Sequence, residues 1–325
     1  RKVMIENKKV AVVIPCYRVS SQIEKVIDRI PSYVDMIYVV DDCCDQQSGK
    51  LVEEKYPQEL VCVIYNEKNQ GVGGAVVSGY KKAIDDGMDI VVKLDGDNQM
   101  DPNLISKFVT PITKGEADYT KGNRFFNFSD SSGMPKIRLF GNIALSFLTK
   151  ASSGYWKIFD PTNGYTAIST TLLKVIPLEK LSKRYFFESD MLFRLAIANA
   201  KVVDIPMKAV YEDEESNLHI RKIFFPFLKG NLRNLSKRIL YKYFLQDFNM
   251  ASLELCFGFI FLLFGFIFGG INWFQNAMLG VETPVGTVVI SAIAIIVGFQ
   301  LLLSFLSYDV SNFPNKAQWP NLKDE

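Results

Sequence analysis

Hydrophobic and polar positions follow two different periods in the first third of the chain. Short runs rich in Val and Ile, typical of buried strands, occupy residues 9–15, 36–40, 61–65 and 90–94. Segments with helical spacing lie between them, at residues 21–30, 49–55 and 73–84. Because strand and helix alternate, the pattern predicts an α/β fold with a mostly parallel sheet that helices cover on both faces. Residues 121–207 mix short strands and loops with a helical stretch near 189–199.

The C-terminal part of the chain is far more apolar. Between Glu254 and Asp309 the only charged residue is Glu282, and two apolar runs cover residues 255–274 and 284–306. Each run is long enough to cross a bilayer, which takes about 20 residues. Two buried helices of a soluble core would need a larger protein around them. We therefore expect a transmembrane hairpin, and residues 1–4 do not resemble a targeting segment.

Basic residues predict the orientation of this hairpin. Seven Lys or Arg residues lie between Arg221 and Lys242 with no acid among them, and the connecting turn has none. The positive-inside rule therefore places residues 1–250 and the C-terminal tail in the cytoplasm, with a bacterial inner membrane as the expected location. Residues 220–248 combine leucines at helical spacing with basic residues, which predicts an amphipathic helix on an anionic leaflet. The alternative is an ordinary surface helix.

These observations divide the chain into four predicted parts. They are a catalytic domain at 1–219, a juxtamembrane helical region at 220–250, the hairpin at 251–308 and a cytoplasmic tail at 309–325. The five Cys residues are an odd number with no repeated spacing, which indicates a reducing compartment without a disulfide framework. With a single His and no Cys-x-x-Cys motif, a zinc site is not expected.

Polar side chains stand where the predicted strands end, and ligands of parallel α/β sheets bind at that edge. Tyr17, Asp41 and Asp42 follow the first two strands. Asp95, Asp97 and Gln99 follow the fourth strand at alternate positions, so on an extended chain all three would face one Mg²⁺ or Mn²⁺ ion. Such a cation also binds the oxygens of a diphosphate. The alternative is an acidic, solvated turn.

The order of these motifs resembles family 2 glycosyltransferases with the Rossmann-like GT-A fold, and more closely the dolichyl-phosphate mannose synthase-like branch. The resemblance covers residues 9–248, and the hairpin matches members with two transmembrane helices. It rests on the sequences VVIPCYR, VVDDCCD, NQGVGGA, DGDNQ, KGNR, DPTNGY and FESD. The family usually continues with Asn-Glu after Tyr17, where this chain has Arg18-Val19.

The resemblance implies roles for individual residues. For the donor nucleotide it implies Pro15, Tyr17, Asp41, Asp42, Gly71 and Asp95, and for the metal Asp95, Asp97 and Gln99. For the acceptor phosphate it implies Arg124, Arg138 and Asn142, and for the donor sugar and acceptor loop Asp160, Gly164, Glu188 and His219. The residues expected to act in catalysis are Asp97, Arg124 and Asp190. Plainer alternatives are helix capping by Asp41 and Asp42, a surface charge at Arg138 and a solvated acidic loop at 212–215.

The implied activity is inverting, metal-dependent transfer of a hexose from a UDP- or GDP-sugar to undecaprenyl or dolichyl phosphate. A phosphate monoester is already largely a dianion at neutral pH, so Asp190 would be needed as a base only for a hydroxyl acceptor. One alternative is a synthase that extends a glycolipid or polysaccharide, although the chain lacks the Gln-x-x-Arg-Trp motif of processive members. Another is a non-catalytic, nucleotide-binding membrane scaffold. Nucleic acid is not an expected partner, and self-association is left open.

Overall fold

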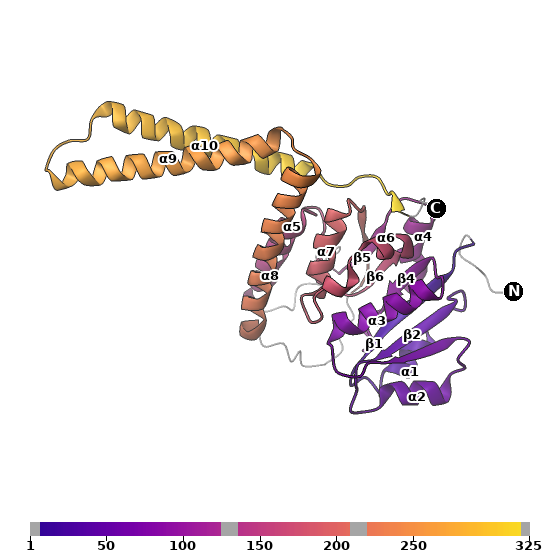
Figure 1. Cartoon of the computed structure of the whole chain (residues 1–325). Helices are drawn as coiled ribbons and strands as arrows, with labels where there is room; N and C mark the ends of the chain where they lie inside the picture. Colours follow the sequence, from indigo (N-terminus) through magenta and orange to yellow (C-terminus); the bar gives the residue numbers. More distant parts are fainter. Residues whose placement is uncertain (1–6, 125–135, 209–219, 320–325) are drawn as a thin grey trace. The chain divides into compact units, whose positions relative to one another are not determined.

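A seven-stranded sheet forms the centre of the N-terminal region (Figure 1). The computed structural model describes residues 7–124, 136–208 and 220–319. The strands are β1 Val10–Cys16, β2 Met36–Asp41, β3 Val61–Tyr65, β4 Ile90–Lys93, β5 Tyr119–Asn123, β6 Thr166–Ser169 and β7 Val202–Pro206. They lie in the order β3-β2-β1-β4-β6-β5-β7, and β6 runs antiparallel to both neighbours while the other pairs are parallel. The predicted mostly parallel α/β sheet is confirmed.

Helices cover both faces of this sheet. They are α1 Ile23–Asp28, α2 Ser48–Lys55, α3 Val72–Asp85, α4 Ile105–Thr113, α5 Lys136–Ser153, α6 Thr170–Val175 and α7 Phe187–Ile197. The predicted segments at 21–30, 49–55, 73–84 and 189–199 correspond to α1, α2, α3 and α7. Among the described residues, two short 3₁₀ turns, Pro102–Leu104 and Leu178–Lys180, lie in the connections.

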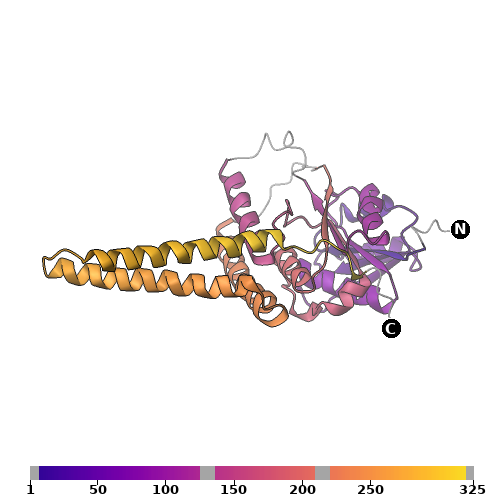
Figure 2. The same cartoon turned by 90° about the horizontal axis from the view of Figure 1, so that it is seen from above.

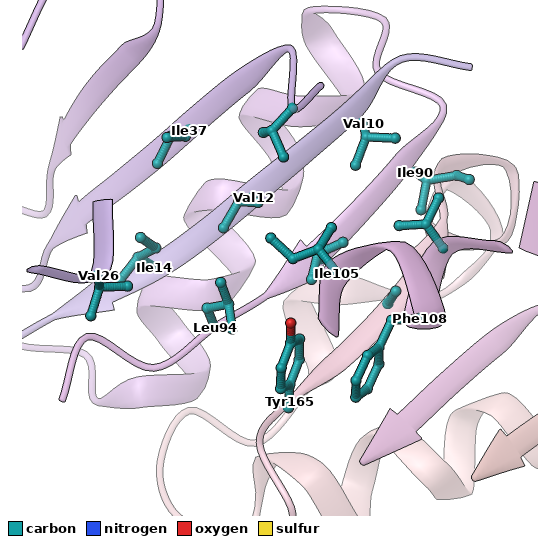
Figure 3. Close-up of a cluster of buried hydrophobic side chains, with 14 of the residues drawn as sticks. Val10, Val12, Ile14, Val26, Ile37, Ile90, Leu94, Ile105, Phe108 and Tyr165 are labelled. Carbon is teal, nitrogen blue, oxygen red and sulfur yellow. The ribbon is translucent and has the colours of Figure 1, made fainter. Parts of the chain in front are cut away.

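Successive residues of β1 point to opposite faces of the sheet, and each face has its own core. Val10, Val12 and Ile14 join a cluster with residues of α1, α2 and α4, part of which Figure 3 shows. In this cluster the rings of Phe108 and Tyr165 stack with centroids 4.0 Å apart. Ala11 and Val13 join the other cluster, with residues of α3, α6 and α7. Burial on both faces explains why these strands are continuous apolar runs.

The chain divides into two compact units. The first contains Arg1–Leu235 and Pro314–Glu325, and the second contains Ser236–Phe313. The second unit includes the end of α8 Ile220–Leu240, a π-helical turn Tyr241–Gln246, and the helices α9 Met250–Met278 and α10 Val285–Ser311. The structure thus groups part of the predicted tail with the sheet, whereas the four-part division made from the sequence stays a prediction.

Helices α9 and α10 lie side by side as a hairpin (Figure 2). Both are long and apolar enough to cross a membrane, as judged by length and composition. At 1.5 Å per residue, 29 and 27 residues span about 40 Å each, more than the roughly 30 Å hydrocarbon core. A Cβ atom on Gly298 would stand 2.7 Å from the Leu262 backbone nitrogen. The two backbones therefore approach closely where glycine leaves room.

A buried ion pair closes the base of this hairpin within the second unit. Arg238 donates from Nη1 and Nη2 to the two carboxylate oxygens of Asp309 at 2.6 and 3.0 Å, and both side chains are 2% exposed. The Tyr243 hydroxyl donates to the same carboxylate at 2.5 Å. The pair therefore fixes the end of α8 against the end of α10.

The segment after the hairpin returns to the first unit. The backbone N–H groups of Gln318 and Trp319 donate to Asp118 Oδ1 at 3.0 and 2.8 Å. The Trp319 indole N–H donates to the Ala198 carbonyl at 3.2 Å, and its ring packs against the core of α3, α6 and α7. Burial raises the pKa of Asp118 although these N–H groups and that of Lys201 lower it. The segment after the hairpin is thus part of the first unit, called the catalytic unit below because it contains the candidate active site.

Candidate active site

The predicted site residues gather at one edge of the sheet. Strands β1, β2, β4 and β5 are parallel and end there. Because β6 is antiparallel, the loop that precedes it, residues 160–165, reaches the same edge. Residues that are more than 100 positions apart along the chain therefore meet around the end of β4.

The metal-site candidates lie in a turn. Strand β4 ends at Lys93, and Asp95–Gln99 follow as a turn in which Asn98 has a φ of +60°. The Gln99 N–H donates to Asp97 Oδ1 at 3.1 Å. The expected extended geometry of Asp95, Asp97 and Gln99 is therefore wrong, because the strand stops two residues before the first carboxylate. Their role in metal binding stays a prediction.

Lys93 joins this turn to helix α7. Its ammonium lies 3.0 Å from Asp95 Oδ1 and 3.2 Å from Glu188 Oε1, and its side chain is 1% exposed. Burial alone would lower the pKa of Lys93, but the two carboxylates beside it raise this pKa above its ordinary value. Glu188, predicted for the sugar and acceptor loop, is thus brought next to Asp95.

Gly164 packs directly over this ion pair. A Cβ atom at this position would stand 2.5 Å from Lys93 Nζ and 2.6 Å from Asp95 Oδ2. Such distances are shorter than side-chain contacts allow, so only glycine fits without displacement. The structure therefore brings Asp95, Gly164 and Glu188 together, as members of one predicted site should be.

A second buried lysine lies one strand further along. Thr166 of β6 pairs with Lys93 of β4 on one side and with Lys121 of β5 on the other. The Lys121 ammonium donates to the Asn163 carbonyl. Burial lowers the pKa of Lys121 to about 8, although Asp160 and Glu188 raise it.

Arg124 is held by Asp160. Its Nε and Nη2 atoms donate to the two carboxylate oxygens at 2.7 and 3.1 Å, in the paired geometry that a guanidinium forms with a carboxylate. Burial would raise the pKa of Asp160, but Arg124 beside it lowers this pKa below its usual range. The predicted contact of Arg124 with phosphate stays a prediction, and the side chain is still 35% exposed.

Asp41 and Asp42 both accept backbone hydrogen bonds. Asp41 accepts from the N–H groups of Cys44 and Gly49 at 2.7 and 2.8 Å, which orders the entry to α2. Asp42 accepts from the Gly71 N–H at 2.7 Å, at the start of α3. Asp41 thus caps α2 through the Gly49 N–H, as the sequence left open, whereas Asp42 orders the turn before α3. Tyr17, with 43% of its surface exposed, remains open to a ligand.

Asp190 differs sharply from its neighbour Glu188. It is fully buried, and its oxygens accept from the Ser182 N–H at 2.9 Å and the Asn234 amide at 3.0 Å. Arg194 lies 3.4 Å away, one turn along the helix. Because α7 is helical, two residues separated by one position point to different sides. The geometry favours a positioning role for Asp190 over a base that meets an acceptor.

Three predicted residues lie outside the side chains that the structure describes. Arg138 and Asn142 belong to α5, but the structure describes their backbone only. His219 and the acidic run at 212–215 lie outside the described residues. Sequence reasoning had in turn missed Lys93 and Lys121. The available signal was a charged residue inside an apolar strand, since a buried lysine requires partners.

The described carboxylates suit a cation that takes most of its ligands from a substrate. In the described part of the chain, no three His, Cys, Asp or Glu side chains form a metal-binding group. Asp95 and Asp97 supply hard oxygen atoms within one turn. Mg²⁺ is commonly held by one or two carboxylates plus substrate phosphates, and this donor set fits that pattern.

Comparison with known proteins identifies the class. Residues 11–176, half of the chain, match the model of glycosyl transferase family 2, and the chain belongs to this family. It is therefore a glycosyltransferase.

Relatives with assigned activities are similar over most of their length. The UDP-N-acetylglucosamine–dolichyl-phosphate N-acetylglucosaminyltransferase of Methanococcus voltae is 30% identical, over 64% of this chain and 88% of its own. The undecaprenyl-phosphate mannosyltransferase of Micrococcus luteus is 26% identical, over 62% and 84%.

A solved structure shares the fold. Glucosyl-3-phosphoglycerate synthase of Mycobacterium tuberculosis, in complex with Mn²⁺, UDP and glucosyl-3-phosphoglycerate, aligns with a TM-score of 0.52 at 18% identity. The alignment covers 71% of this chain and 80% of the other. The GT-A fold expected from the sequence is confirmed.

Proposed function

We propose that this glycosyltransferase transfers a hexose, or its N-acetylamino form, from a nucleoside diphosphate sugar to a polyprenyl phosphate. The observation that carries the proposal is the convergence of Asp95, Gly164 and Glu188 at the sheet edge of a family 2 chain that ends in an apolar hairpin. The two relatives with dolichyl- and undecaprenyl-phosphate acceptors in their names support the lipid acceptor.

The reaction is a single displacement at the anomeric carbon. An oxygen of the acceptor phosphate forms the new bond to this carbon as the bond to the nucleoside diphosphate breaks, so the configuration inverts. Asp95, Asp97 and Gln99 would hold Mg²⁺ or Mn²⁺, which would supply positive charge to the leaving diphosphate. The acceptor phosphate has a second pKa near ~6 and needs no protein base.

The remaining residues bind and orient. Pro15, Tyr17 and the Gly71 turn border the nucleotide, where Asp41 and Asp42 order the backbone. Arg124, fixed by Asp160, presents the edge of its guanidinium toward phosphate. The hairpin anchors the chain in the membrane, with the catalytic unit on the cytoplasmic side as the basic residues predict.

The decisive test is a transfer assay with the purified full-length chain. Labelled UDP- and GDP-sugars are incubated with Mg²⁺ or Mn²⁺ and undecaprenyl or dolichyl phosphate, and we expect one donor to give a lipid-linked sugar that EDTA abolishes. Asp97→Asn should lower kcat/KM by about 100-fold or more, because the diphosphate loses its charge stabilisation.

Asp85→Asn, an exposed change at the end of α3, is the matched control and should leave transfer intact. Activity in EDTA, or an unaffected Asp97→Asn enzyme, would exclude the metal role. A hydroxyl-bearing glycolipid in parallel reactions tests the second candidate function, chain extension. If only that acceptor is glycosylated, the polyprenyl phosphate assignment is wrong, and burial of Asp190 already speaks against a base for such an acceptor.

A further inference from the structure

The ammonium of Lys93 connects two carboxylates that come from distant parts of the chain. Asp95 belongs to the turn after β4, and Glu188, 95 positions after Lys93, belongs to the first turn of α7. Both contacts, at 3.0 and 3.2 Å, are within hydrogen-bond distance. The Lys93 side chain is therefore a direct link between the first turn of α7 and Asp95.

Exposure differs along this connection in a way that points to a ligand. The Lys93 side chain is 1% exposed, whereas those of Glu188 and Asp95 are 13% and 30% exposed. A sealed ammonium costs desolvation energy, and an apolar residue of similar size is often at least as stabilising at such a site. The buried charge of Lys93 thus binds two carboxylates that are themselves partly exposed to solvent.

The surroundings leave the three groups little freedom. Gly164 covers Lys93 and Asp95 at distances that exclude a Cβ atom. At the other end, a Cβ atom on Gly73 would stand 2.8 Å from that of Phe187, and the Gly74 N–H donates to the Lys183 carbonyl at 3.1 Å. The start of α7, and with it Glu188, is therefore packed against the glycine-rich start of α3.

We propose that Lys93 is a positioning residue of the donor site, which holds Asp95 in place against Glu188 before the cation and the diphosphate bind. This inference rests on the proposed use of a metal and a nucleoside diphosphate sugar. It assigns Glu188 an indirect action, through Lys93, on the carboxylate of the metal turn. Neither residue needs to touch the nucleotide for the site to depend on both.

Substitution of Glu188 distinguishes a positioning effect on nucleotide binding from a purely electrostatic one. A complex of Mn²⁺ with UDP or GDP is an anion, so neutralising a nearby carboxylate should by charge alone tighten binding. If Glu188 instead steadies Asp95 through Lys93, Glu188→Gln should weaken binding, by about threefold or more on the scale of coupled neighbours. The measurement is calorimetric titration of the purified full-length enzyme with each nucleotide at saturating Mn²⁺.

A double-mutant cycle tests the route. Lys93→Met keeps an unbranched apolar side chain but removes the ammonium, and we expect binding to weaken by about tenfold. Glu188→Gln added to Lys93→Met should then have little further effect, because the connection is already broken. Lys82→Met, which removes a partly exposed ion pair with Asp86 at the end of α3, is the matched control and should bind like wild type.

The possible results are distinct. Wild type that binds neither nucleotide with Mn²⁺ would overturn the proposed function itself. If wild type binds but Glu188→Gln binds equally or more tightly, the positioning role is wrong. If Glu188→Gln weakens binding by the same factor in both backgrounds, Glu188 acts directly and Lys93 is not the intermediary. Thermal unfolding of each variant reports folding, and should Lys93→Met not fold, the sign of the Glu188→Gln effect decides alone.

Discussion

Gly164 is a position where a single methyl group should disable the site. In Gly164→Ala the new Cβ atom would displace Lys93 Nζ or Asp95 Oδ2, which lie 2.5 and 2.6 Å from its place. We expect kcat/KM for the donor to fall by about tenfold or more, on the scale of a misplaced catalytic group, with little change in melting temperature. Gly270→Ala is the control, since nothing lies within 4 Å of a Cβ atom there. A fully active Gly164→Ala enzyme would contradict the tight packing.

Single residues were predictable from the sequence where a motif carries chemistry. Asp95, Gly164 and Glu188 were expected at the site and lie within one cluster. Lys93 was not expected, because its role depends on a carboxylate 95 positions away that no local pattern reveals. The hydrogen bonds of Asp41 and Asp42 to backbone N–H groups depend on loop conformations, which short motifs do not determine.

At the level of elements, Asp204 links β7 to its surroundings. Its Oδ2 atom accepts from the Phe159 N–H at 2.9 Å and lies 3.4 Å from the amide of Asn123 on β5. Within the described residues, its buried Oδ1 atom has no hydrogen-bond partner. Burial raises the pKa of Asp204 to about 6, although the Phe159 N–H and Lys121 lower it.

Because the pKa of Asp204 is raised, we expect Asp204→Asn to stabilise the fold, and this effect should depend on pH. The folded chain binds the proton more tightly than the unfolded chain, so the free energy of unfolding falls as pH rises from about 4 to about 6 and then stays low. Asparagine mimics the protonated form and should raise the free energy of unfolding at pH 7.5 by about 1–2 kcal/mol. Melting curves between pH 4 and 7.5 should converge at the acidic end. If wild type and Asp204→Asn are equally stable at every pH, burial of the Asp204 charge does not destabilise the fold.

The sequence predicted those helices and strands in which hydrophobic residues recur with a clear period. β1 to β4 and α1 to α3 were found within a few residues, since each carries an apolar run or stripe that must be buried. Strand β6 has four residues and no sign of its direction, so the antiparallel pairing was not foreseen. Helix α5 was missed because Gly141 and Asn142 interrupt its apolar repeat.

On the scale of the whole molecule, the tail should stabilise the catalytic unit. Trp319→Ala removes a ring packed on the core and the indole contact with Ala198. We expect a loss of about 1–3 kcal/mol, which lowers the melting temperature of the catalytic unit. Trp273→Ala, an exposed position on α9, is the control. If both variants melt alike, the contact of the tail contributes nothing.

The hairpin was predicted because an apolar stretch of that length has few other solutions. The ion pair between Arg238 and Asp309 was not, because its partners are 71 positions apart and both read as ordinary charges beside the membrane. Likewise, residues 309–325 were predicted only as a cytoplasmic tail, and the contact of Gln318 and Trp319 with Asp118 was not foreseen. Long-range pairing decides these features, and spacing along the chain does not encode it.

The return of the tail has a consequence for biosynthesis. Residues 314–319 leave the ribosome after both apolar helices, yet they complete the unit that begins with β1. Domains generally fold as units during synthesis, with the N-terminal part first. Here the Asp118 carboxylate and the part of the core that Trp319 covers stay exposed in the nascent sheet until the hairpin has been synthesised. The last step in the folding of the first unit therefore follows the synthesis of both apolar helices.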